Sequence, residues 1–257
     1  MILRRLSQSL KEQNWTAIVI EFILLVSGVF LGIQVSNWNA ARVEQQRADE
    51  LFVRIIDDLE SEKSNVDVLR EYYETTAMYA QIALAEFEQP GSVDPETFVI
   101  SAYQASQWQE TASSRSTFDE IVATGAVNLV RNEKARALLI AYYEYDWTKG
   151  ITVTFRPHYR ELMRGVMPYP IQEAIKVACG DQSKPSGRAI LIMLPKQCDI
   201  AVSSADVERA AAALRATPGL EQALRYQLAE SKTKVGAFTT TSRQLAPLIV
   251  AIKEGVR

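Results

Sequence analysis

Histidine, cysteine, glycine and proline are all scarce in this chain, which has 257 residues but one histidine, two cysteines, 11 glycines and 9 prolines. The single histidine, His158, and the lack of a C-x-x-C motif argue against a zinc site. No G-x-S-x-G motif, Walker loop or nucleotide-binding glycine loop occurs. We therefore predict that the protein is not an enzyme and that it has no catalytic residue, no metal ion and no cofactor.

Strong charge of either sign is also missing. The formal net charge is -3 and the pI is about 5.5. No basic stripe interleaved with aromatic residues occurs, so we expect no nucleic acid among the partners. Alanine, leucine, glutamate, glutamine and arginine dominate most of the chain, a composition that is typical of helices.

One long apolar run is present, Thr16–Val35, and nothing later in the chain resembles a second one. About 20 residues at a rise of 1.5 Å extend roughly 30 Å, the thickness of the hydrocarbon core of a bilayer. Trp15 and Trp38 lie at its two ends, where aromatic rings prefer the level of the lipid headgroups. The predicted division is a cytoplasmic tail (1–14), a transmembrane helix (15–38) and an extracytoplasmic, periplasmic helical domain (39–257).

A cleaved signal peptide is the alternative to a retained anchor. The apolar run is longer than a typical signal core, and no A-x-A-like cleavage site follows it. Lysine and arginine are nearly balanced on its two sides, so the positive-inside rule alone does not set the orientation. The short basic tail and a cysteine pair that suits an oxidising compartment favour an N-terminus inside and a body outside. The predicted location is the inner membrane of a bacterium, with a single pass.

After Trp38, apolar residues recur at alternating spacings of three and four, which predicts a long helix with a coiled-coil-like seam. Glu62 is the one polar gap in the seam, and Gln89-Pro90-Gly91 should end the helix near Glu88. The charged residues of this helix, including Glu60-Ser61-Glu62, are expected to form a solvated face. The seam comprises Phe52, Ile55, Leu59, Val66, Leu69, Tyr73, Thr76, Ala80, Ala83 and Phe87.

Start and stop signals predict five further helices, so the expected fold is mainly α, a long-helix bundle that follows the single transmembrane helix. The last helix is long enough to pack antiparallel on the first. Residues 179–203 are irregular, and Ile190–Met193 is either a short strand or core. The five helices run from Asp94 to about Gln107, from Ser116 to Gly125, from a cap at Asn132, from Ser204 to near Thr217, and from Leu220 onward.

The two cysteines, Cys179 and Cys198, have two interpretations. In a periplasmic body they are expected to form a disulfide that closes the irregular segment. A closed loop of about 20 residues would stabilise the fold by roughly 3 kcal/mol in the chain-entropy model. Two free, buried thiols are the alternative.

Two segments resemble a family of bacterial single-pass membrane proteins that is known only as a domain of unknown function. They are the anchor with its exit, which ends in a Q-x-x-N-W-N pattern, and residues 116–143. Ser36 departs from the pattern, because the family often has asparagine there. The resemblance implies an architecture and no activity. The matching positions are Glu21, Gln34, Asn37, Trp38, Asn39, Phe118, Glu120, Gly125, Leu129, Tyr142 and Tyr143.

Inside the apolar run, Glu21, Gly28 and Gly32 form a candidate contact for another membrane helix. Gly28 and Gly32 make a G-x-x-x-G motif, which lets two helix backbones approach closely. A carboxylate within a bilayer is costly unless it is protonated, paired or able to reach the interface. Glu21 lies seven residues before Gly28 and so shares its face of the helix. Snorkelling of Glu21 and chance occurrence of the glycines are the alternatives.

Two functions fit these features. The favoured one is a non-enzymatic structural or interaction protein that assembles, through its transmembrane helix and long helices, with itself or with the subunits of a larger membrane complex, for example a respiratory or photosynthetic one. The alternative is a periplasmic sensing or binding module that holds a small molecule among Tyr72, Trp108, Tyr142 and Trp147. The inner tail is too short for an output domain, so such a module would act through a partner protein. A membrane-anchored enzyme is the least favoured function.

Overall fold

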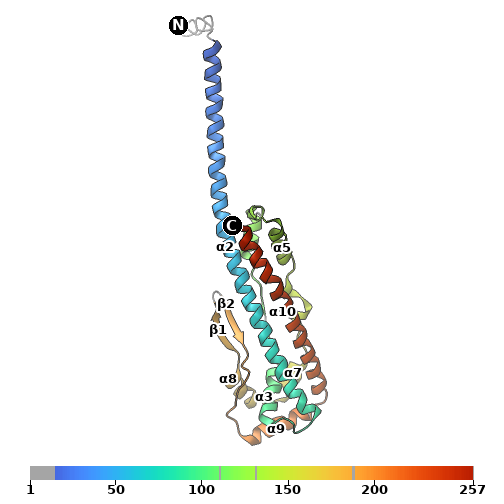
Figure 1. Cartoon of the computed structure of the whole chain (residues 1–257). Coiled ribbons are helices and arrows are strands. Elements are labelled where there is room, and N and C mark those ends of the chain that lie inside the picture. Colours follow the sequence, from blue (N-terminus) through green and yellow to red (C-terminus); the bar gives the residue numbers. More distant parts are fainter. Residues whose placement is uncertain (1–14, 110, 131, 187–188, 257) are drawn as a thin grey trace. The chain divides into compact units, whose positions relative to one another are not determined.

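The computed structural model describes residues 15–109, 111–130, 132–186 and 189–256 (Figure 1). The chain divides into two compact units, Met1–Glu50 and Leu51–Arg257. The fold is mainly α, with a long apolar helix near the N-terminus and a disulfide between Cys179 and Cys198, as the sequence predicts.

Helix α2, Trp15–Glu88, confirms the long helix and its end. All seam residues from Phe52 to Ala83 are buried, and Phe87 is half-buried. Gly91, with φ of 86°, reverses the chain after the helix. The carboxylate of Glu86 accepts hydrogen bonds from the backbone N–H groups of Gly91 and Val93, each at 3.0 Å. The last turn of α2 therefore holds the loop that leads to the next helix.

The predicted caps start the helices where the sequence places them. Asp94 accepts a hydrogen bond from the Thr97 N–H, and Asn132 accepts one from the Ala135 N–H. Gly125, with φ of 74°, follows α4 in the left-handed conformation that glycine favours. The helices between α2 and the last one are α3 (Pro95–Ala105), α4 (Ser116–Ala123), η1 (Ala126–Leu129), α5 (Glu133–Glu144), η2 (Trp147–Lys149), α6 (Ile151–Thr154), α7 (Tyr159–Val166), α8 (Tyr169–Cys179) and α9 (Ser204–Arg215).

Helix α10, Leu220–Val256, packs antiparallel beside the part of α2 that lies in the second unit (Figure 1). Two side-chain contacts show the antiparallel direction, because the later residue of α10 meets the earlier residue of α2. The Ser242 hydroxyl donates to Asp67 at 2.7 Å, and Lys253 pairs with Glu60 further toward the start of α2. Leu220, Leu224, Phe238, Leu245, Ile249 and Ile252 are buried as predicted, whereas Leu228 and Val235 are half-buried.

The irregular segment contains a β-hairpin, which decides between the two predictions for Ile190–Met193. Strands β1, Gln182–Ser186, and β2, Ala189–Met193, pair antiparallel with Gln182 opposite Met193. Two contacts fasten the segment that follows β2 to α2. The Tyr79 hydroxyl donates to the Pro195 carbonyl at 2.8 Å, and Lys196 pairs with Glu71 at 2.8 Å.

The disulfide joins the end of α8 to the segment after the hairpin, with 19 residues of sequence separation. Cys179 is 1% exposed. The Gln104 side chain on α3 donates to the Cys179 carbonyl at 2.6 Å, which fixes the same point to the core. The prediction of a disulfide is confirmed, and the alternative of two free thiols is wrong.

Replacing both cysteines with alanine is expected to lower the free energy of unfolding by about 3 kcal/mol, because the unfolded chain regains the freedom of the closed loop. Denaturant titration of the full-length protein in detergent measures the change. A reductant should destabilise the wild type by a similar amount and leave the double variant unaffected. A double variant as stable as the oxidised wild type would contradict this expectation.

Candidate functional site

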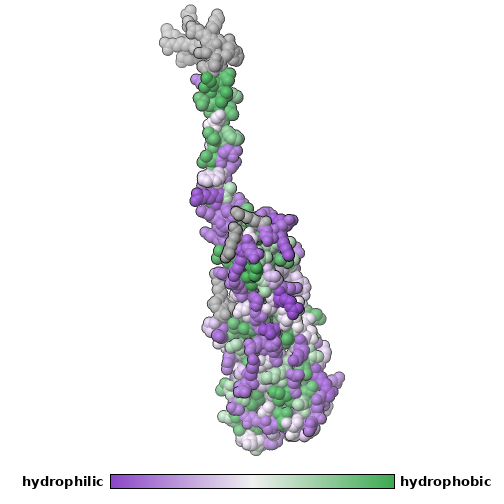
Figure 2. All heavy atoms as spheres, in the orientation of Figure 1, coloured by the Kyte–Doolittle hydropathy of each residue, from purple (hydrophilic) through white to green (hydrophobic). Residues whose placement is uncertain are grey.

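The apolar part of α2 is exposed along its whole described length. Every residue from Val19 to Val35 is exposed, and the hydrophobic side chains cover the surface of this stretch in Figure 2. The helix is long and apolar enough to cross a membrane, and none of its most apolar 18-residue window is buried within the described chain. A long, continuous apolar surface that no other element covers is uncommon on soluble monomeric proteins.

The predicted contact residues lie on this exposed stretch. A Cβ atom added to Gly28 or Gly32 would meet no atom of the described chain within 4 Å. Glu21 precedes Gly28 by seven residues in one unbroken helix, so the two share a face. Trp38 is 67% exposed. The Trp15 side chain lies outside the described residues, although its backbone begins α2.

In the second unit, Glu62 is the centre of a polar network that the sequence did not suggest. Its Oε1 atom accepts hydrogen bonds from the Ser113 hydroxyl at 2.6 Å, the Tyr142 hydroxyl at 2.8 Å and the Trp147 indole N–H at 2.9 Å. Burial, followed by the nearby Glu62 charge, raises the pKa of Tyr142 above its usual value. The predicted solvated face is therefore wrong for Glu62, which is half-buried and joins α2 to three later segments.

Lys234 on α10 is a charged residue that is almost completely buried, at 2% exposed. Its ammonium donates to the backbone carbonyls of Val153 at 3.0 Å and Phe155 at 2.9 Å. It also lies 5.0 Å from the centre of the Tyr73 ring, within cation–π range. Burial lowers the pKa of Lys234 to about 8. This lysine ties α10 to the end of α6.

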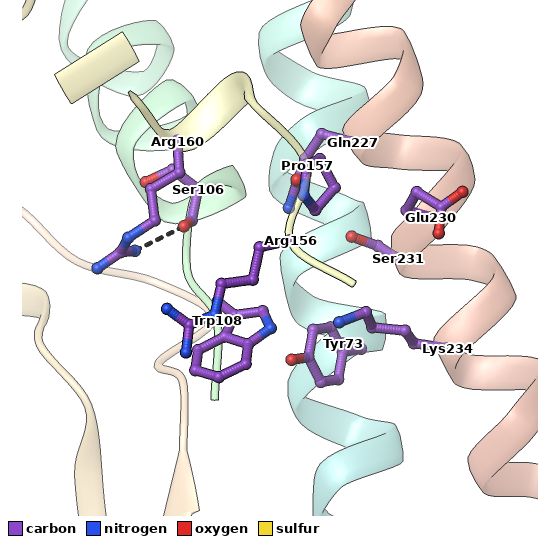
Figure 3. A pocket seen from close by; sticks show the side chains of 10 residues that line it. All are labelled: Tyr73, Ser106, Trp108, Arg156, Pro157, Arg160, Gln227, Glu230, Ser231 and Lys234. Atoms are coloured by element: carbon purple, nitrogen blue, oxygen red, sulfur yellow. Dashed lines mark hydrogen bonds between the residues drawn. The ribbon is translucent and has the colours of Figure 1, made fainter. Parts of the chain in front are cut away.

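A small cavity lies beside this lysine, and Figure 3 shows the side chains that surround it. Its volume is about 10 Å³, which is room for roughly one water molecule. Trp108 forms one wall, and the guanidinium of Arg156 stacks on its ring at 3.6 Å from the ring centre. Arg160, at the rim, donates to the Ser106 carbonyl at 2.7 Å.

The four aromatic residues suggested for a ligand do not form one site. Trp108 borders the small cavity, whereas Tyr142 and Trp147 border a separate, partly open hollow of about 240 Å³ between α5 and α10. The Tyr72 hydroxyl points elsewhere and donates to Asp181 at 3.1 Å. The prediction that these four side chains converge on one pocket is therefore wrong, because the intervening Tyr73 and Phe238 rings fill the core between them.

His158 lies at the surface. Its Nδ1 atom is 2.7 Å from a carboxylate oxygen of Glu161 on the first turn of α7, and both side chains are mostly exposed. Within the described residues, no group of three or more histidine, cysteine, aspartate or glutamate side chains is arranged to hold a metal ion.

Sequence reasoning missed Glu62 and Lys234 for different reasons. The sequence does mark Glu62, because it is the one polar position in an otherwise apolar seam. Lys234 follows two exposed positions of an ordinary amphipathic helix, and nothing in the sequence marks it as buried. Its burial depends on Trp108 and on the carbonyls of residues 153 and 155, which are far away in the sequence.

Comparison with known proteins assigns neither a family nor a function to this chain. The chain matches no protein-family model, and no curated protein or solved structure is significantly similar to it.

Proposed function

We propose that the protein is a single-pass membrane protein of the bacterial inner membrane that assembles with another membrane helix. The observation that carries the proposal is the fully exposed apolar stretch of α2, which the described chain leaves without any covering element. Exposing this apolar surface to water would be strongly unfavourable, whereas lipid tails in a bilayer would cover it without any other protein element. The apolar stretch is about as long as the hydrocarbon core of a bilayer is thick, which supports a membrane-spanning helix.

The proposed orientation places residues 1–14 in the cytoplasm and the body in the periplasm. The disulfide supports this, because such bonds persist in oxidising compartments. The alternatives for the apolar helix are a cleaved signal sequence and a core helix of a soluble protein. A core helix would be covered by its own chain, and this window is 0% buried.

The proposed contact is the face that carries Glu21, Gly28 and Gly32. The two glycines leave the backbone open to close approach by a second helix. A carboxyl group on the same face can then hydrogen-bond to that helix instead of facing lipid. The second helix belongs to another copy of this chain or to a subunit of a larger membrane complex. The proposed role is structural and non-enzymatic, and the proposed family is the one that the anchor and residues 116–143 resemble.

Replacing Glu21 with leucine is expected to weaken assembly roughly 5- to 30-fold, which corresponds to the loss of one interhelical hydrogen bond of about 1–2 kcal/mol. Membrane retention should persist, because leucine is more apolar than glutamate. The measurement is gentle detergent extraction from native membranes, followed by native gels and mass spectrometry of the co-migrating chains. Mass spectrometry also separates self-assembly from a complex with other subunits.

The matched control is Ile23→Leu, a conservative change two residues away on a different face of the same helix. It should leave assembly unchanged. A wild-type protein that is extracted as a lone monomer, or a Glu21→Leu variant that assembles like the wild type, would refute the proposed contact.

A further inference from the structure

The partly open hollow of about 240 Å³ between α5 and α10 is lined by three aromatic side chains (Figure 1). They are Tyr142 on α5, Tyr145 at the end of α5 and Trp147 on η2. Tyr145 is 68% exposed and Trp147 is 6% exposed, so the hollow extends from the surface toward the core. Ligand pockets usually measure about 300–1,000 Å³, and a hollow at or below the lower end of that range suits a small organic molecule.

A carboxylate is bonded to two of these three rings. The Glu62 Oε1 atom accepts hydrogen bonds from the Tyr142 hydroxyl at 2.8 Å and from the Trp147 indole N–H at 2.9 Å. Its third donor is the Ser113 hydroxyl, so all three donors are neutral, and Glu62 forms no ion pair with another described residue. Hydrogen bonds polarise the groups that they join. Donation to an anion therefore makes both rings more attractive to a cation.

Positive charge is absent from the lining of the hollow. Among the described residues, no lysine, arginine or histidine lines it. Asp146 pairs with Lys149 at 2.8 Å, and Arg115, which lines a smaller hollow nearby, pairs with Asp119 at 3.0 Å. Arg243 is exposed on α10 and is not a lining residue. The wall is therefore aromatic, apolar and adjacent to a carboxylate whose partners are all neutral.

We propose that this hollow binds a small organic cation with a methylated ammonium group, of the kind that choline carries. Aromatic side chains attract such cations through the negative potential of their rings. The methyl groups require apolar contacts, which Leu138 and Leu248 provide, and the Gln244 amide is available to a polar end of the molecule. All of these residues belong to the second unit. The inference is therefore independent of the contact proposed for the membrane helix.

The test is thermal unfolding of the full-length protein in dodecyl maltoside, a detergent without an ammonium group, with choline chloride replacing sodium chloride at constant ionic strength. The midpoint should rise with the choline concentration, by about 3–6 °C at ten times the dissociation constant. The matched probe is the uncharged analogue of choline, in which a tert-butyl group replaces the trimethylammonium group. It should bind about 5- to 30-fold more weakly, because the rings no longer attract a charge.

Equal midpoints in choline chloride and sodium chloride would overturn the proposal. Equal stabilisation by choline and by its uncharged analogue would overturn it as well, because the hollow would then be an apolar site without preference for a cation.

Substitutions of Tyr145 locate the effect, because this side chain is mostly exposed and its loss should not prevent folding. Tyr145→Ala removes one ring and should weaken choline binding about 2- to 5-fold. Tyr145→Phe keeps the ring and should bind choline like the wild type. Tyr169→Ala is the control elsewhere on the surface, because Tyr169 is 71% exposed on α8. Unchanged binding in Tyr145→Ala would contradict this location of the site.

Glu62→Gln tests the contribution of the carboxylate. The amide still offers an oxygen to the same donors but carries no charge. Choline binding should weaken, whereas binding of the uncharged analogue should stay the same. Equal weakening of both would show that Glu62 acts only through the shape of the hollow and would contradict the electrostatic argument. If this variant does not fold, the two Tyr145 variants still decide the proposal.

A methylated ammonium group can come from a free solute or from a lipid headgroup, and reconstitution distinguishes the two sources. In nanodiscs of phosphatidylcholine, headgroups that reach the hollow would compete with added choline. Choline should then stabilise the protein less than it does in nanodiscs of phosphatidylglycerol. Equal stabilisation in the two kinds of nanodisc would assign the site to a free solute, and no stabilisation in either would overturn the proposal.

Discussion

Replacing Phe238 with alanine is expected to lower the free energy of unfolding by about 3–5 kcal/mol, the range for removing a fully buried aromatic side chain. Phe238 is 1% exposed at the middle of α10. Its ring stacks on Tyr73 of α2 at 5.7 Å between centres and meets the edge of Trp147 at 6.1 Å. The substitution therefore leaves a cavity where α2, α10 and η2 meet.

Thermal or denaturant unfolding of the full-length protein in detergent measures this effect, and the midpoint temperature should fall by roughly 10 °C. Val250→Ala is the control on the same helix, because Val250 is 53% exposed and its loss should change stability by less than about 0.5 kcal/mol. Similar effects of the two substitutions would show that α10 does not pack on α2 through Phe238.

Replacing Glu86 with alanine is expected to cost about 3 kcal/mol, because it leaves several donors without an acceptor. The Glu86 side chain is 0% exposed and pairs with Arg215 at 2.8 Å. It also accepts the N–H groups of Gly91 and Val93. The loop between α2 and α3 and the end of α9 both lose their common anchor.

The contribution of Glu86 also predicts a pH dependence. Burial alone would raise the pKa of Glu86, but hydrogen bonds from Gly91, Val93 and Arg215 outweigh it and lower the pKa below the usual value of 4.5. The unfolded chain therefore binds this proton more readily than the folded one does. The stabilisation is complete above the unfolded pKa of 4.5 and is lost as the pH falls through the lower, folded pKa.

The measurement is the stability difference between wild type and Glu86→Ala at pH 7 and at successively lower pH values below 4.5. The difference should shrink as the pH falls. Glu88→Ala is the control, because Glu88 is exposed at the end of the same helix. A difference that stays constant with pH would show that the lost contacts do not depend on the charge of Glu86.

Most of the secondary structure follows from local sequence signals. The seam from Phe52 to Ala83 requires a helix that buries one face, because apolar residues at spacings of three and four align on one side. Asp94 and Asn132 cap helices through hydrogen bonds that span three residues, and Gly91 and Gly125 supply positive φ angles. All of these effects act between near neighbours in the chain.

Some of the candidate sites can be found from the sequence, and others appear only in the structure. Glu21, Gly28 and Gly32 are found from the sequence, because the membrane-spanning pattern and the seven-residue spacing are local. The network around Glu62 and the cavity beside Lys234 are not, since their partners lie 51 to 85 and 79 to 81 residues away. The sequence also leaves the pairing of Cys179 with Cys198 open.

By itself, the sequence of this protein determined one long helix with an apolar start, the helix face that carries Glu21, and five of the later helices with their approximate limits. Periodicity and capping suffice for these, because they involve residues within a turn or two of each other. The sequence did not predict α6, α7 and α8. Only the tertiary structure decided that Glu62 accepts hydrogen bonds from three later segments, that Lys234 lies beside a cavity, and that the four aromatic residues do not converge. Those outcomes depend on how α2, α10 and the segments between them pack, which no local pattern specifies.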